Sequence, residues 1–274
     1  MIKIGITGST GVLGKSLIYH LKKISRYKTY NYKHNILNKK KIEHWIKKNQ
    51  FQIIIHLAAL VPTKKVSKNF KLANDVNIKG TKNLVNSIKK FQNQKVFLFF
   101  SSTSHVYSFS KKKIKETSKT KGITQYGKTK ILAEKFLMNN NNFYDLCIGR
   151  ISSLTSENQN INFVIKKIIE FGKQTNNFNF GNSNIKRDFI YVDDISKIII
   201  KIIRNEITGI INISNSQTTH LYKLIDHLKK KYRLSINHFL GKEEILVLSN
   251  KLLLKKIGKF KFIKINKIIK KFFK

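Results

Sequence analysis

A tyrosine and a lysine four residues apart, Tyr126 and Lys130, are the side chains of this sequence best suited to proton transfer. On a helix this spacing puts both side chains on one face. The ammonium charge would favour the phenolate, so the phenol could exchange a proton nearer neutral pH. Thr103, which follows an apolar run, could offer a hydroxyl to the same substrate oxygen. The three groups together suit alcohol–ketone interconversion, with a nicotinamide exchanging the hydride.

A nicotinamide dinucleotide needs a turn that binds its pyrophosphate. Residues 7–14 have the glycine spacing of such a turn. A short apolar run is followed by Thr7 and then by Gly8, Gly11 and Gly14 in the spacing GxxGxxG. The first glycine would permit the tight turn, the second would let the ligand reach bare backbone, and the third would let helix and strand pack closely. The helix that follows would offer free N–H groups and a positive dipole end to the phosphates.

Apolar runs rich in Ile, Val and Phe alternate with helical patterns as far as residue 213. After the first strand we expect strands at 28–32, 51–60, 96–100, 144–151 and 209–213, and helices at 39–48, 73–91, 125–138 and 195–204. This alternation predicts a parallel sheet covered on both faces. Ligands of such sheets bind beyond the carboxyl ends of the strands, where the strand order reverses. The glycine turn, HLAAL at 56–60, Thr103 and Arg150 all fall at the carboxyl ends of these strands, so we expect them at that edge.

Beyond residue 151 the pattern changes, with helices expected at 163–171, 221–231, 250–257 and 266–273. We assign residues 1–151, with about 186–213, to the larger cofactor-binding domain. Residues 152–185 and 214–274 would form a small substrate-binding lobe. The last helix sets apolar side chains against lysines, and packing onto this lobe is favoured over lying on a membrane surface.

The net charge of +41 is unusual for a chain of 274 residues. It raises the question of a nucleic-acid or anionic-membrane partner. Only five of the 55 basic residues are arginine, the lysines are scattered, and Pro62 is the sole proline. AT-rich codons would produce such a composition, which we favour over a selected site for a polyanion.

Several classes of protein are excluded or disfavoured by the sequence. No apolar run approaches the ~20 residues that span a bilayer. The chain starts directly on a strand, so we expect no signal peptide and a cytoplasmic location. Cys147 is the only cysteine, which supports neither a disulfide nor a thiolate metal site, and we expect no metal.

Taken together, the motifs resemble those of the extended short-chain dehydrogenases/reductases of the NAD-dependent epimerase/dehydratase family, which act mainly on nucleotide sugars. The resemblance runs from residue 1 to about 213 and, more weakly, onward. Its motifs are TGSTGVLG at 7–14, HLAA at 56–59, Asn77 with Gly80-Thr81, SSTSHVY at 101–107, the Tyr126–Lys130 pair and RDFIYVDD at 187–194.

The resemblance implies an α/β Rossmann fold, a doubly wound parallel sheet with a small, partly interleaved C-terminal substrate lobe, and a homodimer formed through the Tyr126 helix. It implies Thr103, Tyr126 and Lys130 as catalytic residues. The cofactor-binding residues would be Gly8, Thr10, Gly11, Val12, Leu13, Gly14, Asn35, Ile36, Leu57, Ala58, Ala59, Asn77, Ser101, Tyr126 and Lys130. The nucleotide-sugar substrate would contact Thr103, Ser104, His105 and Arg187, the last at its diphosphate.

Departures from the family pattern bear on the reaction. The family's 4,6-dehydratases usually have Asp-Glu after the catalytic Thr, whereas Ser104 and His105 stand here, which disfavours dehydration. His105 could still move a proton, and a solvent-edge histidine without a role is an equal alternative. The chain is also shorter than usual in its substrate lobe, as in the compact sugar reductases of the family such as dTDP-4-dehydrorhamnose reductase.

The choice of cofactor is left between NAD and NADP, with NAD favoured. No acidic residue that could hold the ribose hydroxyls of NAD follows the second strand at residues 31–34. Residues 35–38, Asn-Ile-Leu-Asn, resemble the family's adenine-contacting DIxD. Lys33 could accept a 2′-phosphate, which allows NADP.

Three functions fit these observations. An NAD-dependent 4-epimerase is favoured because RDFIYVDD is intact. An NAD(P)H-dependent reductase of nucleotide 4-keto sugars is the alternative. A non-catalytic Rossmann protein that binds NAD(P) or RNA through its charge is a third, against which the intact Thr103, Tyr126 and Lys130 argue.

Overall fold

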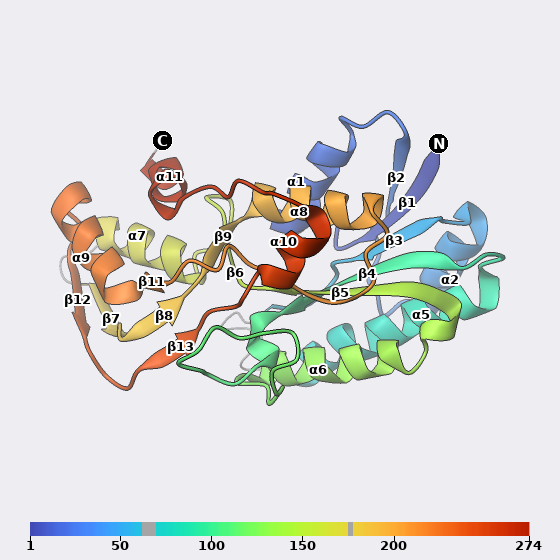
Figure 1. The fold of residues 1–274 in the computed structure, drawn as a ribbon. Helices are drawn as coiled ribbons and strands as arrows, with labels where there is room; N and C mark the ends of the chain where they lie inside the picture. The colour runs from blue at the N-terminus through green and yellow to red at the C-terminus, as the bar shows by residue number, and fades with distance from the viewer. Residues whose placement is uncertain (62–69, 175–177, 274) are drawn as a thin grey trace.

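The core of the fold is a six-stranded parallel sheet (Figure 1). The computed structural model describes residues 1–61, 70–174 and 178–273. The strands are β1 (Ile2–Thr7), β2 (Tyr27–Asn31), β3 (Ile53–His56), β4 (Val96–Thr103), β5 (Tyr144–Ile151) and β10 (Gly209–Ile213). Their order is β10-β5-β4-β3-β1-β2, with every neighbouring pair parallel. The predicted doubly wound sheet is therefore confirmed, and its order reverses between β1 and β3.

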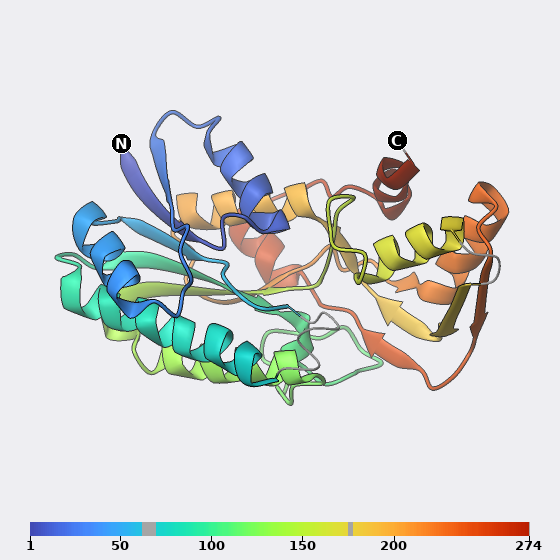
Figure 2. The same ribbon diagram turned by 180° about the vertical axis from the view of Figure 1, so that it is seen from behind.

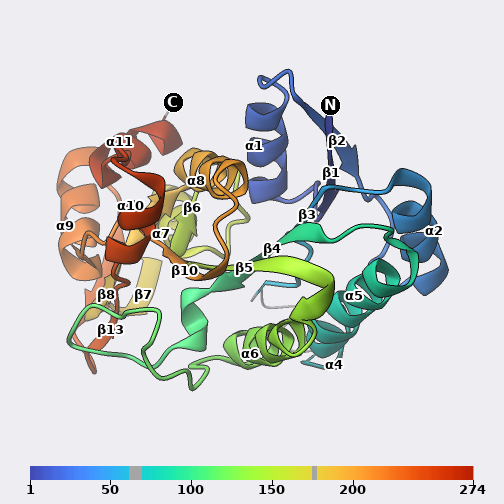
Figure 3. The same cartoon turned by 45° about the vertical axis from the view of Figure 1, so that its right-hand side comes forward.

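Helices cover both faces of this sheet (Figure 3). One face carries α1 (Val12–Leu21), α8 (Val192–Arg204) and α10 (Lys251–Ile257), and the other carries α2 (Lys39–Asn49), α5 (Gly80–Phe91) and α6 (Gln125–Met138). Side chains of one strand point alternately to the two faces. Ile53 and Ile55 accordingly join the core beneath α1 and α8, while Ile54 joins the core beneath α2 and α5.

A smaller lobe lies beside the sheet, at the end where β5 runs on into it (Figures 1 and 2). Strand β7 (Phe178–Asn182) pairs with β12 (Ile236–Phe239), and β8 (Ile185–Arg187) lies between β11 (Thr219–His220) and β13 (Glu244–Leu246). Strands β6 (Ser153–Thr155) and β9 (Phe189–Tyr191) pair where the chain crosses between the two parts. Helices α7 (Val164–Gln174), α9 (Leu221–Tyr232) and α11 (Ile265–Lys270) pack with this lobe. The predicted packing of the last helix is confirmed, because Ile268, Ile269 and Phe272 are buried there.

Several predicted elements begin or end at residues other than those expected, most clearly the third and fourth strands and the helix between them. The strand expected at 51–60 stops at His56, because the next residues turn toward Thr7: the N–H groups of Leu57 and Ala58 donate to its carbonyl and hydroxyl oxygens. The fourth strand continues to Thr103. The helix expected at 73–91 starts earlier, as α4 (Phe70–Asn74), and passes through a π-helical turn (Asp75–Lys79) before α5.

Two further observations concern what the described part of the chain contains. None of its helices has both the length and the apolar composition needed to cross a bilayer. Within the same residues, no group of three or more His, Cys, Asp or Glu side chains is placed to hold a metal ion. Cys147 is buried in β5 with a free thiol.

Candidate active site

In the glycine turn between β1 and α1, neighbouring backbone atoms leave no room for a side chain at two of the three glycines. Gly8 has a φ of +73°, and a Cβ there would lie 2.6 Å from the backbone nitrogen of Ala58. A Cβ on Gly14 would lie 2.3 Å from the carbonyl oxygen of Gly8. At Gly11 the only described atom within 4 Å of an added Cβ is that same oxygen, at 3.4 Å. The open side of the turn is therefore at Gly11, the glycine expected to meet the ligand.

The amino terminus of α1 is free to bind an anion. Gly11 is its N-cap residue, no described side chain caps it, and its first turn contains no acidic residue. Thr10 and Gly11 are exposed, whereas Val12 and Leu13 are partly buried against the cores below. Unpaired N–H groups beside an open glycine fit a pyrophosphate group.

His56 connects the glycine turn to α5 through hydrogen bonds of fixed direction. The Thr81 hydroxyl donates to the Asn77 carbonyl (2.8 Å), so its oxygen must accept from Nε2–H of His56 (3.0 Å). Nδ1 of His56 then accepts from the Thr7 hydroxyl (2.6 Å), whose oxygen accepts from the Ala58 N–H (3.3 Å). Burial lowers the pKa of His56 to about 3, which keeps the ring neutral.

Asn77 joins the segment after β3 to the helix that carries Tyr126. It is buried in the π-helical turn, where its side chain accepts from the Leu60 N–H (2.8 Å) and donates to the Leu60 carbonyl (3.1 Å). Its amide also donates to the Thr129 hydroxyl (3.0 Å), which donates to the Tyr126 carbonyl (2.8 Å). Leu57, Ala58 and Ala59, in the same segment, are partly exposed.

Thr103, His105 and Tyr126 come together where β4 ends. The Thr103 hydroxyl accepts from the His105 N–H (3.3 Å), and the His105 ring meets the Tyr126 ring edge-on, with centroids 6.4 Å apart. A Cβ on Gly127 would lie 2.1 Å from the His105 carbonyl oxygen, so only glycine allows this approach. Thr124 caps α6 by accepting from the Gly127 N–H (3.0 Å), and its hydroxyl lies 3.2 Å from His105 Nδ1.

The protonation states of the Tyr–Lys pair differ from the expectation. Burial raises the pKa of Tyr126, which is opposite to the predicted shift toward neutral pH, because desolvation disfavours the phenolate. Lys130 is 1% exposed, and burial lowers its pKa to about 7, against a raising effect of Glu134. Its Nζ lies 3.9 Å from the centroid of the Phe100 ring. The phenol of Tyr126 is consequently protonated at neutral pH.

Arg187 reaches this site from the small lobe. Its charge, after burial, contributes to lowering the pKa of His105 to about 4. The guanidinium pairs with the Glu244 carboxylate, with 3.0 Å between Nη2 and Oε2. Ser104 is buried beside Thr103, and Ser101 is partly exposed in β4. The structure thus brings the predicted substrate-contacting residues to the boundary between sheet and lobe.

The predicted adenine segment is held by its own hydrogen bonds. Asn35 Oδ1 accepts from the Leu37 N–H (3.0 Å), and Ile36 is buried so close to Gly80 that a Cβ there would lie 2.5 Å from it. Asn83 donates to the carbonyls of Ile36 and Leu37, both at 3.3 Å. The sequence analysis missed Asn83, although a polar residue three positions after Gly80 on one helix face was a readable signal.

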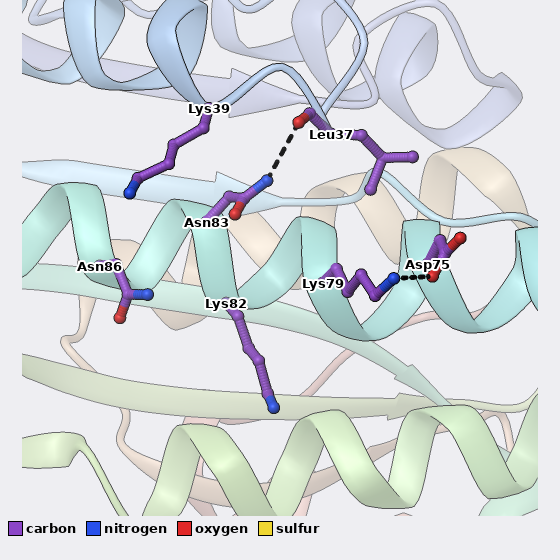
Figure 4. A pocket seen from close by; sticks show the side chains of 7 residues that line it. All are labelled: Leu37, Lys39, Asp75, Lys79, Lys82, Asn83 and Asn86. Carbon is purple, nitrogen blue, oxygen red and sulfur yellow. Dashed lines mark hydrogen bonds and ion pairs between the residues drawn. The ribbon is translucent and has the colours of Figure 1, made fainter.

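Two pockets flank this segment. Asn31 and Lys33 line one of about 580 Å³, together with Tyr32, His34 and Trp45. Asn31 Oδ1 is buried and has no hydrogen-bond partner within the described residues, whereas Lys33 is exposed. The other pocket, of about 500 Å³, lies between the start of α2 and α5 (Figure 4). It contains none of the residues near Tyr126, and its Lys79 is paired with Asp75, so we assign it no part in the reaction.

Arg150 lies near the end of β5, as expected, but serves the packing of the fold. Its Nε and Nη2 bind Glu134, with 2.7 Å between Nη2 and Oε2, and its Nη1 donates to the Tyr107 hydroxyl and the Glu116 carbonyl. Arg150 and Glu134 are 4% and 2% exposed. The sequence analysis missed Glu134, which lies four residues after Lys130 on α6 and links this helix to β5.

Comparisons with known proteins agree with this geometry. Residues 6–250 match the family described as GDP-mannose 4,6 dehydratase. The chain is 30% identical over 221 residues to the GDP-6-deoxy-D-talose 4-dehydrogenase of Aggregatibacter actinomycetemcomitans, covering 76% of this chain and 74% of that protein. RMD from Pseudomonas aeruginosa, solved with NADPH, is similar in fold with a TM-score of 0.88, 18% identity and coverage of 99% and 98%. The Thermus thermophilus UDP-glucose 4-epimerase, solved with NAD, has a TM-score of 0.84, 15% identity and 99% coverage of both chains.

Proposed function

Since the chain belongs to the GDP-mannose 4,6-dehydratase family of the extended short-chain dehydrogenases/reductases, we propose that it reduces a keto group on the sugar of a nucleotide sugar. The observation that carries this proposal is the meeting of the Thr103 hydroxyl and the Tyr126 ring at His105, where the family's dehydratases have a carboxyl group. A protonated phenol beside a hydroxyl can donate a proton to a carbonyl oxygen, as reduction requires.

The surrounding residues have separate parts in this proposal. The Thr103 hydroxyl, held at the end of β4, binds the same carbonyl oxygen. Tyr126 gives its proton to that oxygen, and the ammonium form of Lys130, which burial leaves about half populated near pH 7, stabilises the phenolate that remains. Loss of water is disfavoured, because Ser104 and the neutral His105 stand where the dehydratases have carboxyl groups.

NAD(P) is the cofactor that we propose for this reaction, and it supplies the hydride when bound. Gly11 and the uncapped start of α1 would bind its pyrophosphate, and Ile36 and Asn35 would border its adenine. Asn31 Oδ1, a buried acceptor without a described partner, would take a hydrogen bond from a ribose hydroxyl. NADH therefore fits this position, and the exposed Lys33 allows NADPH as well.

Arg187 would bind the diphosphate of the substrate. The 30% identical relative supports carbon 4 as the site of reaction, since its name gives it as a 4-dehydrogenase of a GDP-sugar. A second candidate is a 4-epimerase. The RDFIYVDD segment, which runs unbroken through β9 into α8, favours it.

We also propose that the active form is a homodimer formed through α6. Leu132 is 51% exposed in the middle of this helix, which leaves an apolar side chain for contact with a second copy. Sedimentation of the purified chain at several concentrations tests this, and a monomer throughout would refute it.

Incubation of the purified protein with NADH or NADPH and a panel of UDP-, dTDP- and GDP-linked 4-keto sugars tests the proposed reaction, with products separated by chromatography. Equimolar loss of reduced cofactor and formation of the alcohol are expected. Isomerisation of a nucleotide sugar without net change in the cofactor would identify the epimerase instead. No conversion across the panel, with cofactor bound, would refute both.

A further inference from the structure

We infer that Glu244 is an internal counter-ion of Arg187 that the diphosphate of the substrate must displace. The inference rests on the proposed function, in which Arg187 binds that diphosphate. It goes further in assigning to Glu244 an opposing effect on substrate affinity.

The carboxylate of Glu244 is not needed to hold Arg187 in place. Nη1 of the guanidinium donates to two backbone carbonyls, those of Lys186 and Glu244, both at 3.0 Å. These bonds use both hydrogens of Nη1 and fix the plane of the group. Glu244 Oε2 takes one hydrogen of Nη2 at 3.0 Å, so what the carboxylate adds is chiefly its charge.

The Glu244 carboxylate opposes anion binding at Arg187 because the pair is only partly exposed to solvent. The side chain of Arg187 is 15% exposed and that of Glu244 is 36% exposed, so solvent screens the pair less than it screens a pair on an open surface. The neighbouring His105 is neutral at pH 7, and Phe109 lies against the guanidinium, 5.4 Å from its ring centroid. A diphosphate arriving at Arg187 therefore meets a cation whose charge is already compensated.

A second ion pair beside the first supplies a matched control. Lys186 Nζ lies 2.6 Å from Glu243 Oε1, and each of these residues directly precedes its counterpart in the Arg187–Glu244 pair. Lys186 and Arg187 are successive residues of β8, so their side chains point to opposite faces of the lobe sheet. Changing Glu243 removes the same charge at nearly the same place without touching Arg187.

The chain uses its few acidic residues here. It has 14 acidic residues against 55 basic ones, yet Glu243 and Glu244, at the start of β13, form ion pairs with Lys186 and Arg187 of β8. Unpaired, the two bases would attract any phosphate. Compensation by Glu244 would keep simple phosphates off Arg187, while a ligand with further contacts in the site can displace the carboxylate.

Calorimetric titration of UDP and of inorganic pyrophosphate into wild-type, Glu244→Gln and Glu243→Gln proteins tests the inference. Glutamine keeps an oxygen for Nη2 but removes the charge. We expect Kd in Glu244→Gln to fall about fivefold for both ligands, equivalent to ~1 kcal/mol, with Glu243→Gln close to wild type.

An unchanged or higher Kd in Glu244→Gln, with binding by the wild type intact, would overturn the inference and leave the proposed function standing. An equal gain in both variants would also overturn it, because a general charge effect would then suffice. Absence of UDP and pyrophosphate binding in all three proteins would overturn the inference together with the assignment of Arg187 to the diphosphate.

Discussion

The ring of His105 stands edge-on to the ring of Tyr126, with their planes at 71° and their centroids 6.4 Å apart. Gly127 permits this approach, because any side chain there would collide with the His105 backbone. A neutral imidazole thus lies beside Tyr126, the proposed proton donor, at a position where the family's dehydratases carry a carboxyl group. The arrangement supports proton delivery to a carbonyl rather than removal of a hydroxyl.

The role of Gly11 in ligand binding and the role of Gly14 in packing can be separated by substitution. Gly11→Ala should leave the melting temperature within about 2 °C of wild type and weaken NAD(P) binding at least about tenfold, because its Cβ meets only one described atom but occupies the ligand's side. Gly14→Ala should lower both stability and binding, since its Cβ would collide with the Gly8 carbonyl. Thermal unfolding and fluorescence titration measure the two effects. Equal behaviour of the two variants would contradict this division.

Lys33 should contribute to NADPH binding and not to NADH binding. We expect wild-type dissociation constants for the two cofactors within about tenfold of each other. Lys33→Ala should raise Kd for NADPH about fivefold and leave Kd for NADH unchanged, because only the 2′-phosphate would meet the ammonium. Lys48→Ala, which removes another exposed lysine lining the same pocket, is the control. A similar rise in Kd for both cofactors would contradict the assignment of Lys33 to the 2′-phosphate.

Breaking the buried pair between Glu134 and Arg150 should strongly destabilise the fold. Glu134→Gln leaves the Arg150 charge buried without its counter-ion, which costs about 3 kcal/mol in free energy of unfolding. The double variant Glu134→Leu, Arg150→Met should recover part of that loss. Lys95→Ala, which removes an exposed pair with Asp145, should cost less than about 1 kcal/mol. Comparable losses from the buried and the exposed pair, in urea denaturation, would contradict the account.

Asp188 should make the protein less stable as pH rises from about 4 to 7. Burial raises its pKa from the usual 3.8 to about 7, so in this interval the folded chain binds a proton that the unfolded chain has lost. Its carboxyl accepts from the Ser214 hydroxyl through Oδ2, and Oδ1 has no partner among described residues. Asp188→Asn should therefore gain stability relative to wild type as pH rises, by up to a few kcal/mol at ~1.4 kcal/mol per pKa unit.

Urea denaturation of Asp188→Asn and wild type at pH 4.5 and pH 7.5 measures this difference. The exposed Asp145 supplies the control substitution, Asp145→Asn, whose effect should not follow the same course. A stability difference between Asp188→Asn and wild type that is independent of pH would contradict the prediction.

Local patterns in the sequence were sufficient to predict the parallel sheet and the edge at which the candidate residues meet. Buried strands have continuous apolar runs, and glycines report backbone contacts that admit no side chain, as Gly8 and Gly14 do. These signals depend on near neighbours in the chain. They could not reveal the π-helical turn that buries Asn77, because its geometry follows from bonds to Leu60 and Thr129.

Charge pairs and protonation states were equally out of reach. Glu244 lies 57 residues from Arg187 and meets it only because β13 adds beside β8. The pKa of Tyr126 follows from desolvation, and no spacing of residues reports how deeply a phenol is buried. Arg150 is a further example. Its position at the end of a strand suggested contact with a ligand, but its side chain pairs with Glu134.

Reduction of a nucleotide 4-keto sugar by wild-type and Tyr126→Phe proteins, measured side by side as oxidation of NADH or NADPH, tests the account most directly. The account predicts stoichiometric cofactor oxidation by the wild type. It predicts turnover at least about 100-fold lower in Tyr126→Phe, with an unchanged cofactor Kd, because only the proton donor is lost. Turnover by Tyr126→Phe close to that of the wild type would contradict the central claim.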